Sequence, residues 1–240
     1  MTSMKLNGNR ILKVVTMVLM SMAMVLSCTK EKMPITMGLN TIGSIKGDIF
    51  TDDRGMTHVI SESVCDYEDM ERAYAEFDLL EKVAEGKYSI RLRYVHAPLC
   101  KDPLRKSAAD DSELGNDPVK IADGWISGGY INLKLDFCFR QGSETKHFIN
   151  LVYDDTMPKD TIRLSLRHNG YGEGRMYPGD ASLSVGQSIA CFRTEGLLPE
   201  GKDEIPVVIS GSWYETVTTE DGVMMTGGLT EFKNKGVLKR

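Results

Sequence analysis

The sequence lacks a surplus of basic residues. It holds 29 Lys and Arg residues against 34 Asp and Glu residues, and its formal net charge is −5. Proteins that bind nucleic acid need a basic surface that displaces counterions from the phosphate backbone. A basic surface is also what docks proteins electrostatically on anionic lipid. The composition therefore argues against both kinds of partner, and we expect no nucleic acid among the protein's partners.

The sequence also lacks the short motifs of common catalytic and metal sites. It contains no G-x-S-x-G nucleophile elbow, no H-x-x-x-H pair and no D-x-D-x-D-G calcium loop. The acidic pairs Asp52-Asp53 and Asp154-Asp155 fall at predicted turns, where solvated carboxylates are common. We therefore expect no enzymatic activity, no metal and no cofactor.

One long apolar run is present, and it lies near the first residue. Three basic residues precede a run from Val14 to Leu26 that carries two polar residues. This run is shorter than the ~20 residues of a membrane span, but it suits a secretory signal. It ends in Val25-Leu26-Ser27-Cys28, the pattern that a lipoprotein signal peptidase reads. We expect residues 1–27 to be a signal peptide and Cys28 to carry lipid.

Cleavage before Cys28 would have two consequences. Residues 1–27 hold three basic and no acidic residues, so the net charge of the remainder changes from −5 to −8. Attachment must then come from acyl chains such as palmitate on Cys28, and two or more chains suffice for stable anchoring. We expect a lipid anchor in the outer membrane of the cell envelope. The sequence does not decide between its periplasmic and cell-surface faces.

Four cysteines remain after lipidation, namely Cys65, Cys100, Cys138 and Cys191. An exported compartment permits disulfides, but no C-x-x-C or other short pairing occurs. We favour four separate thiols that pack as small apolar residues. The alternative is bridging, and the domain division would favour Cys65 with Cys100 and Cys138 with Cys191.

The pattern beyond residue 37 is that of an all-β protein. Residues 28–37 are a polar tether, and short runs of alternating polar and apolar residues follow, separated by turn residues. Evenly spaced runs of this kind indicate a sandwich or barrel rather than βαβ units. Residues 67–86 fit both a helical face and an alternating strand, so the pattern alone leaves their structure open. The acidic, proline-containing residues 106–118 are predicted to link two domains, 38–105 and 119–240.

Several stretches carry a resemblance to a known family, and they occur in the family's order. They are Glu71–Leu80 followed by Tyr88–Leu92, Leu99-Cys100-Lys101-Asp102, Asn116–Val119, Trp125–Asn132, His147–Val152 and Leu166–Asn169. With these stretches the chain resembles the NigD-like lipoproteins of Gram-negative anaerobes. The resemblance implies an N-terminal OB-like barrel followed by an immunoglobulin-like β-sandwich, with residues 72–80 as strand. The family offers no catalytic residues.

The densest polar cluster is Arg167, His168 and Asn169 with Tyr171. One interpretation is a small-ligand site at a strand end. The other is structural: alternation points His168 into the core, while its neighbours anchor the following loop. We favour the structural interpretation. Thr156 and Thr161 each lie in an Asp-Thr-aliphatic triplet that resembles an O-glycan acceptor signal.

Aromatic side chains offer another kind of site. An OB-like barrel can bind oligosaccharides, and Tyr74, Tyr88 and Tyr94 are candidate stacking surfaces. Trp125 and Trp213 lie in apolar strand patterns, which favours core packing. We expect a lipid-anchored envelope lipoprotein with a non-enzymatic binding or accessory role towards a protein or glycan. The alternatives are immunity against an envelope-acting bacteriocin, and hydrolysis of an envelope glycan by paired carboxylates.

Overall fold

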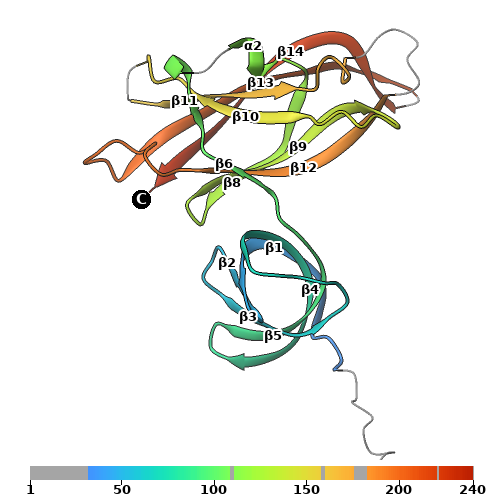
Figure 1. Ribbon diagram of the computed structural model, residues 1–240, viewed down its shortest axis with the longest axis vertical. Helices are drawn as coiled ribbons and strands as arrows, with labels where there is room; N and C mark the ends of the chain where they lie inside the picture. The colour runs from blue at the N-terminus through green and yellow to red at the C-terminus, as the bar shows by residue number, and fades with distance from the viewer. Residues whose placement is uncertain (1–31, 109–110, 158–159, 176–182, 221, 240) are drawn as a thin grey trace, which may run out of the picture.

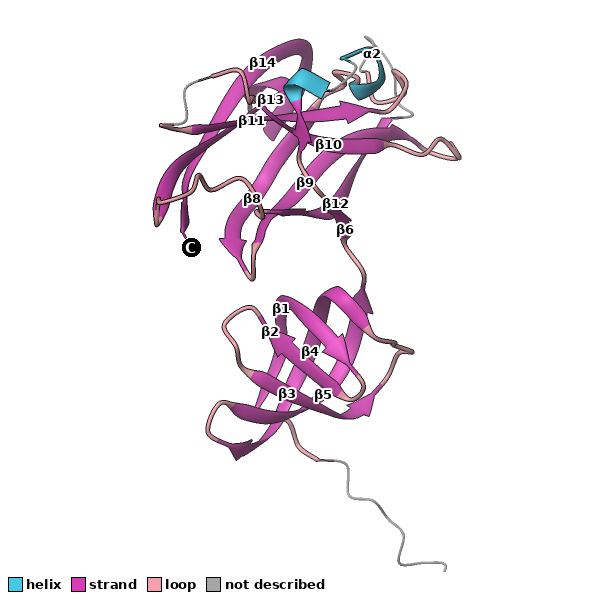
Figure 2. Cartoon of the chain, turned by 60° about the vertical axis from the view of Figure 1, so that its left-hand side comes forward, coloured by secondary structure: helices cyan, strands magenta, loops and turns pink. Residues whose placement is uncertain are grey.

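The computed structural model describes residues 32–108, 111–157, 160–175, 183–220 and 222–239. Cys28 and the predicted signal peptide lie outside these residues. The strands are β1 (Thr36–Lys46), β2 (Ile49–Asp52), β3 (Thr57–Ser63), β4 (Met70–Ala84), β5 (Lys87–His96), β6 (Leu99–Lys101), β7 (Leu104–Arg105), β8 (Val119–Ser127), β9 (Tyr130–Arg140), β10 (Phe148–Tyr153), β11 (Ile162–Asn169), β12 (Leu183–Arg193), β13 (Glu204–Thr219) and β14 (Gly222–Lys239). Within the described ranges, a 3₁₀ turn (Lys106–Ala108) and the single helical turn α2 (Asp111–Leu114) are the only helical elements. The predicted all-β class is confirmed (Figure 2).

The first five strands form a closed barrel in the order β1-β2-β3-β5-β4, with β1 and β4 closing the ring. Neighbours pair antiparallel except β3 and β5, which are parallel. Figure 1 shows this barrel stacked under the rest of the molecule along its long axis. Five strands closed in this way are the kind of barrel predicted for the N-terminal domain.

Strand β4 resolves the ambiguity of residues 67–86. Ala73, Ala75 and Phe77 alternate into the barrel, where they pack with residues such as Phe50 and Ile90. Small residues on the inner face fit the narrow interior of a five-stranded barrel. A Cβ at Gly43 would lie 2.1 Å from the carbonyl oxygen of Thr51, so β1 can bend between its two partners there only with glycine.

The remaining strands form a β-sandwich (Figure 1). One sheet has the order β14-β13-β11-β10-β7 and the other the order β6-β12-β9-β8. Alternating residues of both sheets fill a single core, including Leu133, Leu135, Leu151, Leu164 and Phe192. The two inner faces bury these side chains against each other, which is the main source of stability in such sandwiches.

The chain crosses between the two units earlier than the sequence suggested. Strand β5 ends at His96, and β6 begins at Leu99 as part of the sandwich. Strand β6 pairs in parallel with β12, and β7 pairs in parallel with β10. Residues 97–98 therefore connect the barrel to the sandwich, and residues 99–105 are edge strands of the sandwich. The short strands satisfy their backbone groups on existing sheet edges, which composition alone does not reveal.

The predicted linker, residues 106–118, lies against the sandwich. Arg167 donates to the carbonyl oxygen of Gly115 at 2.8 Å, and Asp117 accepts hydrogen bonds from the backbone NH groups of Gly170 and Gly172 at 2.9 and 3.0 Å. Burial raises the pKa of Asp117, but these hydrogen bonds and Arg175 outweigh burial and hold the pKa below its usual value. Polar contacts thus fix a segment that has little apolar surface to bury.

Candidate functional site: the cleft between barrel and sandwich

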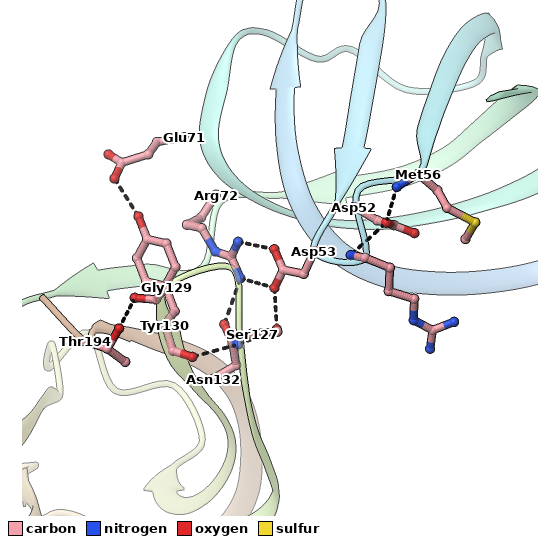
Figure 3. A network of polar contacts seen from close by, with 11 residues as sticks. Asp52, Asp53, Met56, Glu71, Arg72, Ser127, Gly129, Tyr130, Asn132 and Thr194 are labelled. Carbon is pink, nitrogen blue, oxygen red and sulfur yellow. Dashed lines mark hydrogen bonds and ion pairs between the residues drawn. The ribbon is translucent and has the colours of Figure 1, made fainter. Parts of the chain in front are cut away.

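A buried ion pair joins the barrel to the sandwich (Figure 3). Arg72 on β4 donates two hydrogen bonds to the carboxylate of Asp53, at 2.6 and 2.8 Å, and a third to the side-chain oxygen of Asn132 on β9 at 2.9 Å. Ser127, at the end of β8, donates to the same carboxylate. Burial raises the pKa of Asp53, but the bonds from Arg72 and Ser127 outweigh burial and lower it overall. We call Asp53, Arg72, Ser127 and Asn132 the joint.

The β8–β9 turn contains two glycines beside the joint. Gly128 has φ +58°, and a Cβ there would lie 2.3 Å from Oδ1 of Asp53. Gly129 has φ +80°, but its Cβ would meet nothing within 4 Å. The first glycine is therefore needed for both conformation and space, and the second for conformation alone.

A second set of contacts supports the joint (Figure 3). The guanidinium of Arg72 lies 4.3 Å from the ring centre of Tyr130, whose hydroxyl donates to Glu71 at 2.6 Å. Arg193 on β12 pairs with the same Glu71 at 2.9 Å. The two units therefore meet through bidentate and networked charges, which fix orientation better than single exposed ion pairs.

Two adjoining cavities lie beside the joint, between barrel and sandwich. They measure about 270 and 450 Å³, and Tyr74 and Lys134 line both. Barrel residues on the walls include Asn40, Tyr94 and His96. Sandwich residues include Asp123, Trp125, Asp136, Gln187 and Ser188. We call this pair of cavities the cleft.

Aromatic rings line the barrel side of the cleft. His96 lies between Tyr74 and Tyr94, with ring centres 5.4 and 5.6 Å away. Tyr94 is 49% exposed, so its ring is open to a ligand. Burial raises the pKa of Tyr74 and lowers the pKa of His96, so both rings are neutral at pH 7. Nδ1 of His96 is buried and has no hydrogen-bond partner among the residues that the structure describes.

The sandwich side of the cleft is more polar. Lys134 lies about equally far from the rings of Tyr74 and Trp125, with Nζ 6.0 and 5.9 Å from their centres. The side-chain amide of Gln187 donates to Asp136 at 2.9 Å. Aromatic faces with a few amide, carboxylate and ammonium groups can hold a ligand that presents both C–H faces and hydroxyls.

The structure brings together only part of the aromatic set named from sequence. Tyr74 and Tyr94 line the cleft, whereas Tyr88 packs against the barrel core near His58. Trp125, expected in a core, packs at the edge of the cleft and is half-buried. Trp213 packs in a separate cluster with Cys138 and Tyr214. His96 and Lys134 were missed, although alternation places Lys134 on the outer face between Leu133 and Leu135.

The Arg167 cluster lies in the sandwich, outside the residues that line the cleft. His168 is fully buried, with Nδ1 3.1 Å from the carbonyl oxygen of Pro118 and Nε2 3.0 Å from Nδ1 of His147. Asn169 donates to the carbonyl oxygen of Glu113 and accepts from the backbone NH of Tyr171. Tyr171 has φ +53° and is exposed. These contacts tie residues 111–118 and the following loop to the strand.

The two acidic pairs differ from the expectation of solvated turn carboxylates. Asp52 is 5% exposed, accepts from the backbone NH groups of Arg54 and Met56, and lies 3.3 Å from His58. Its neighbour Asp53 belongs to the joint. The expectation is therefore wrong for this pair, because a β-turn can aim its carboxylates inward when a buried cation meets them. Asp154 and Asp155 are half-buried and contact Lys106 and Ser107.

The remaining predicted sites are distributed over both units. All four cysteines in the described ranges are free thiols, and Cys138 and Cys191 are buried. Cys138 pairs with Val185 across the sheet, whereas Cys191 pairs with Asn132, so a Cys138–Cys191 bridge is out of reach. Thr156 is exposed in its loop, and Thr161 is half-buried.

The residues that the structure describes lack two other kinds of feature. They contain no group of three or more His, Cys, Asp or Glu side chains placed to hold a metal ion. Nor do they contain a helix long and apolar enough to cross a membrane.

The fold and the joint define a class of two-unit, all-β proteins in which a five-stranded barrel abuts a β-sandwich. Residues 102–193 match the NigD-like C-terminal beta sandwich domain. The match confirms the predicted resemblance to the NigD-like proteins over this part of the chain. The match begins at residue 102, between the edge strands β6 and β7.

Solved structures of similar proteins share this fold. A NigD-like immunity protein from Bacteroides caccae is 14% identical, with a TM-score of 0.56 over 82% of this chain and 94% of that one. A proposed lipoprotein from Bacteroides fragilis is 15% identical, with a TM-score of 0.53 over 82% and 97%. A proposed toxin-related protein from Parabacteroides distasonis is 22% identical, with a TM-score of 0.54 over 82% and 92%. Comparison with curated proteins gives no match.

Proposed function

We propose that this protein is a lipid-anchored envelope protein that binds a glycan, without turnover, in the cleft between barrel and sandwich. The observation that carries the proposal is the set of rings around His96, one of them half exposed, opposite the polar side chains of Lys134, Asp136 and Gln187. The C–H bonds of a sugar ring pack on the negative face of an aromatic ring, and its hydroxyls need amide and carboxylate partners. The orphan Nδ1 of His96 adds a further polar atom.

A glycan fits the cleft better than the alternatives in charge and size. The chain is acidic overall, so a nucleic acid would be repelled. The two cavities have room for a few sugar rings, whereas a stable protein partner needs about 800 Å² of surface on each side. Lys134 and Arg54 both line the walls, and their positive charges also suit a glycan that carries acidic groups.

The test is binding of the full protein, purified from membranes in detergent, to immobilised envelope and capsular polysaccharides. The proposal predicts retention by at least one polysaccharide and release by excess soluble oligosaccharide. It also predicts no new reducing ends. Besides Asp53 of the joint, the cleft is lined by the carboxylates of Asp123 and Asp136. Release of sugar that stops in Asp136→Asn would establish the hydrolase alternative instead.

The anchor is tested separately from the cleft. The basic start, short apolar run and Val25-Leu26-Ser27 motivate lipidation of Cys28, and the lipoprotein proposed in Bacteroides fragilis has the same fold. A fatty-acid probe should label the wild type and leave Cys28→Ala unlabelled. Equal labelling of both would reject the anchor. Protease treatment of intact cells distinguishes the cell-surface face from the periplasmic face.

A second candidate is immunity against a bacteriocin, favoured by the immunity protein of Bacteroides caccae that shares the fold. In that case, cells without the gene should become sensitive to bacteriocins from neighbouring strains. Unchanged sensitivity together with polysaccharide binding would leave glycan binding as the function.

A further inference from the structure

We propose that Cys100 and Cys191 form a disulfide in the mature protein, which fixes the first strand after the crossing to the sheet that lines the cleft. The two residues are direct partners in the parallel pairing of β6 with β12. Neighbouring strands lie about 4.8 Å apart, and disulfides join residues whose Cα atoms are about 4.4–6.8 Å apart. In-register partners in a parallel pair also point to the same face of the sheet.

The pair occupies a defined place on the face of the sheet that meets the barrel. Cys191 pairs in turn with Asn132, and Asn132 with Trp125, so that one row runs across all four strands from Cys100 to Trp125. Arg72 binds Asn132 in this row at 2.9 Å. Both cysteines pack in the apolar cluster with Ile42, Tyr130 and Ile189. A bridge would therefore lie between the joint and the crossing at residues 97–98.

The other two cysteines have no comparable partner. Cys65 lies in the barrel, beside Ser63. Cys138 lies six residues along the sheet from the row of Asn132, opposite Val185. At about 3.3 Å per residue this is roughly 20 Å, well beyond the reach of a disulfide. The geometry singles out one pair among the four thiols.

The bond forms by thiol–disulfide exchange with a disulfide oxidant, either an oxidoreductase of the envelope or a small-molecule disulfide. The thiolate of one cysteine attacks the oxidant, which gives a mixed disulfide and releases one thiolate. The second cysteine attacks the mixed disulfide, closes the Cys100–Cys191 bond and releases the second thiolate. The two cysteine protons end on the released thiols, and the oxidant gains two electrons. An oxidising compartment is needed, so formation in cells rests on the proposed envelope location.

Burial sets when this exchange can occur. It raises the pKa of Cys191 to about 12 and also raises the pKa of Cys100. Little thiolate therefore exists at neutral pH once the chain is folded, and exchange in the folded, reduced protein is slow. The bond should form while the chain folds, before the two thiols are buried.

The experiment is peptide mapping of the full-length protein, expressed with its own signal sequence and denatured in iodoacetamide before digestion. We expect a linked peptide containing Cys100 and Cys191, with Cys65 and Cys138 alkylated without prior reduction. Cys100→Ser should make Cys191 reactive, whereas the matched variant Cys65→Ser should leave the linked peptide in place. Linkage of either Cys100 or Cys191 to another cysteine would overturn the proposal, and alkylation of both in the wild type would show that the bond does not form in cells.

A second experiment tests the Cys100–Cys191 pairing independently of the proposed envelope location. The denatured, reduced full-length chain is refolded in detergent with a glutathione redox buffer and mapped in the same way. The linked peptide should form during refolding and much more slowly in the folded, reduced protein. A linked peptide in this experiment with free thiols in cells would contradict the envelope location and support the pairing. Its absence from refolded protein would overturn the pairing itself.

Discussion

Arg72 in the barrel and Asn132 in the sandwich are joined by a hydrogen bond of 2.9 Å, although 60 residues separate them in the chain. Both residues lie in stretches that carry the family resemblance. The same guanidinium holds Asp53 in a bidentate pair, so one side chain fixes the walls on both sides of the cleft. The cleft is thus a consequence of how the two units are joined.

Removing the cation of the joint should destabilise the protein strongly. Arg72→Met leaves Asp53 buried without its partner, and breaking a buried pair in this way costs about 3–5 kcal/mol. Lys82→Met, which removes the exposed ion pair with Glu85, should cost less than about 1 kcal/mol. Urea denaturation of both variants measures the difference. Equal, small losses would show that the joint contributes little.

The two glycines of the β8–β9 turn should respond unequally to alanine. Gly129→Ala only adds a Cβ to a residue in the left-handed conformation, which costs about 1–2 kcal/mol. Gly128→Ala adds a clash with Asp53 and so displaces the ion pair as well. We expect a loss at least ~1 kcal/mol larger for Gly128→Ala by thermal or urea unfolding. Equal losses would place Asp53 away from this turn.

The stability of the protein should fall as the pH drops below about 6.5, the usual pKa of histidine. Burial holds the pKa of His168 below its usual value, so the unfolded chain binds the proton more readily than the folded protein does. The free energy of unfolding therefore decreases as the pH falls through the unfolded value, by at most about 1.4 kcal/mol per pH unit for this group.

His168→Gln is the variant that tests this pH dependence. A glutamine can still donate to the carbonyl oxygen of Pro118 and accept from His147, but it does not titrate. Urea denaturation between pH 8 and pH 5 should give a flatter profile for the variant than for the wild type. Identical slopes would mean that His168 does not titrate differently in the two states.

Much of the fold could be predicted from the sequence, because period-two alternation reports a half-buried strand directly. Residues 131–139 and 162–168 are examples, and the structure shows them as parts of strands β9 and β11. Residues 67–86 show the limit of this signal, since helical and strand spacing coincide there. The family resemblance, rather than the pattern, selected the strand that β4 confirms.

The joint and the cleft could not be predicted in the same way. In the sequence, Asp53 has the pattern of a solvated turn residue. Only the folded structure shows that Arg72, from another strand of the barrel, pairs with it where the two units meet. Residues 106–118 look like a linker because they are acidic and poor in apolar residues, yet Gly115 and Asp117 are held by polar contacts with β11 and its loop. Contacts of this kind depend on tertiary placement, which local composition does not encode.

The most direct test of glycan binding in the cleft is isothermal titration of the wild type, Tyr94→Ala and Tyr171→Ala with the polysaccharide fragment that the binding screen identifies. Both tyrosines are exposed, at 49% and 66%, so neither substitution should unfold the protein. The account predicts at least a ~10-fold weaker affinity for Tyr94→Ala, equivalent to about 1.4 kcal/mol, and wild-type affinity for Tyr171→Ala. Unchanged affinity in Tyr94→Ala would contradict it.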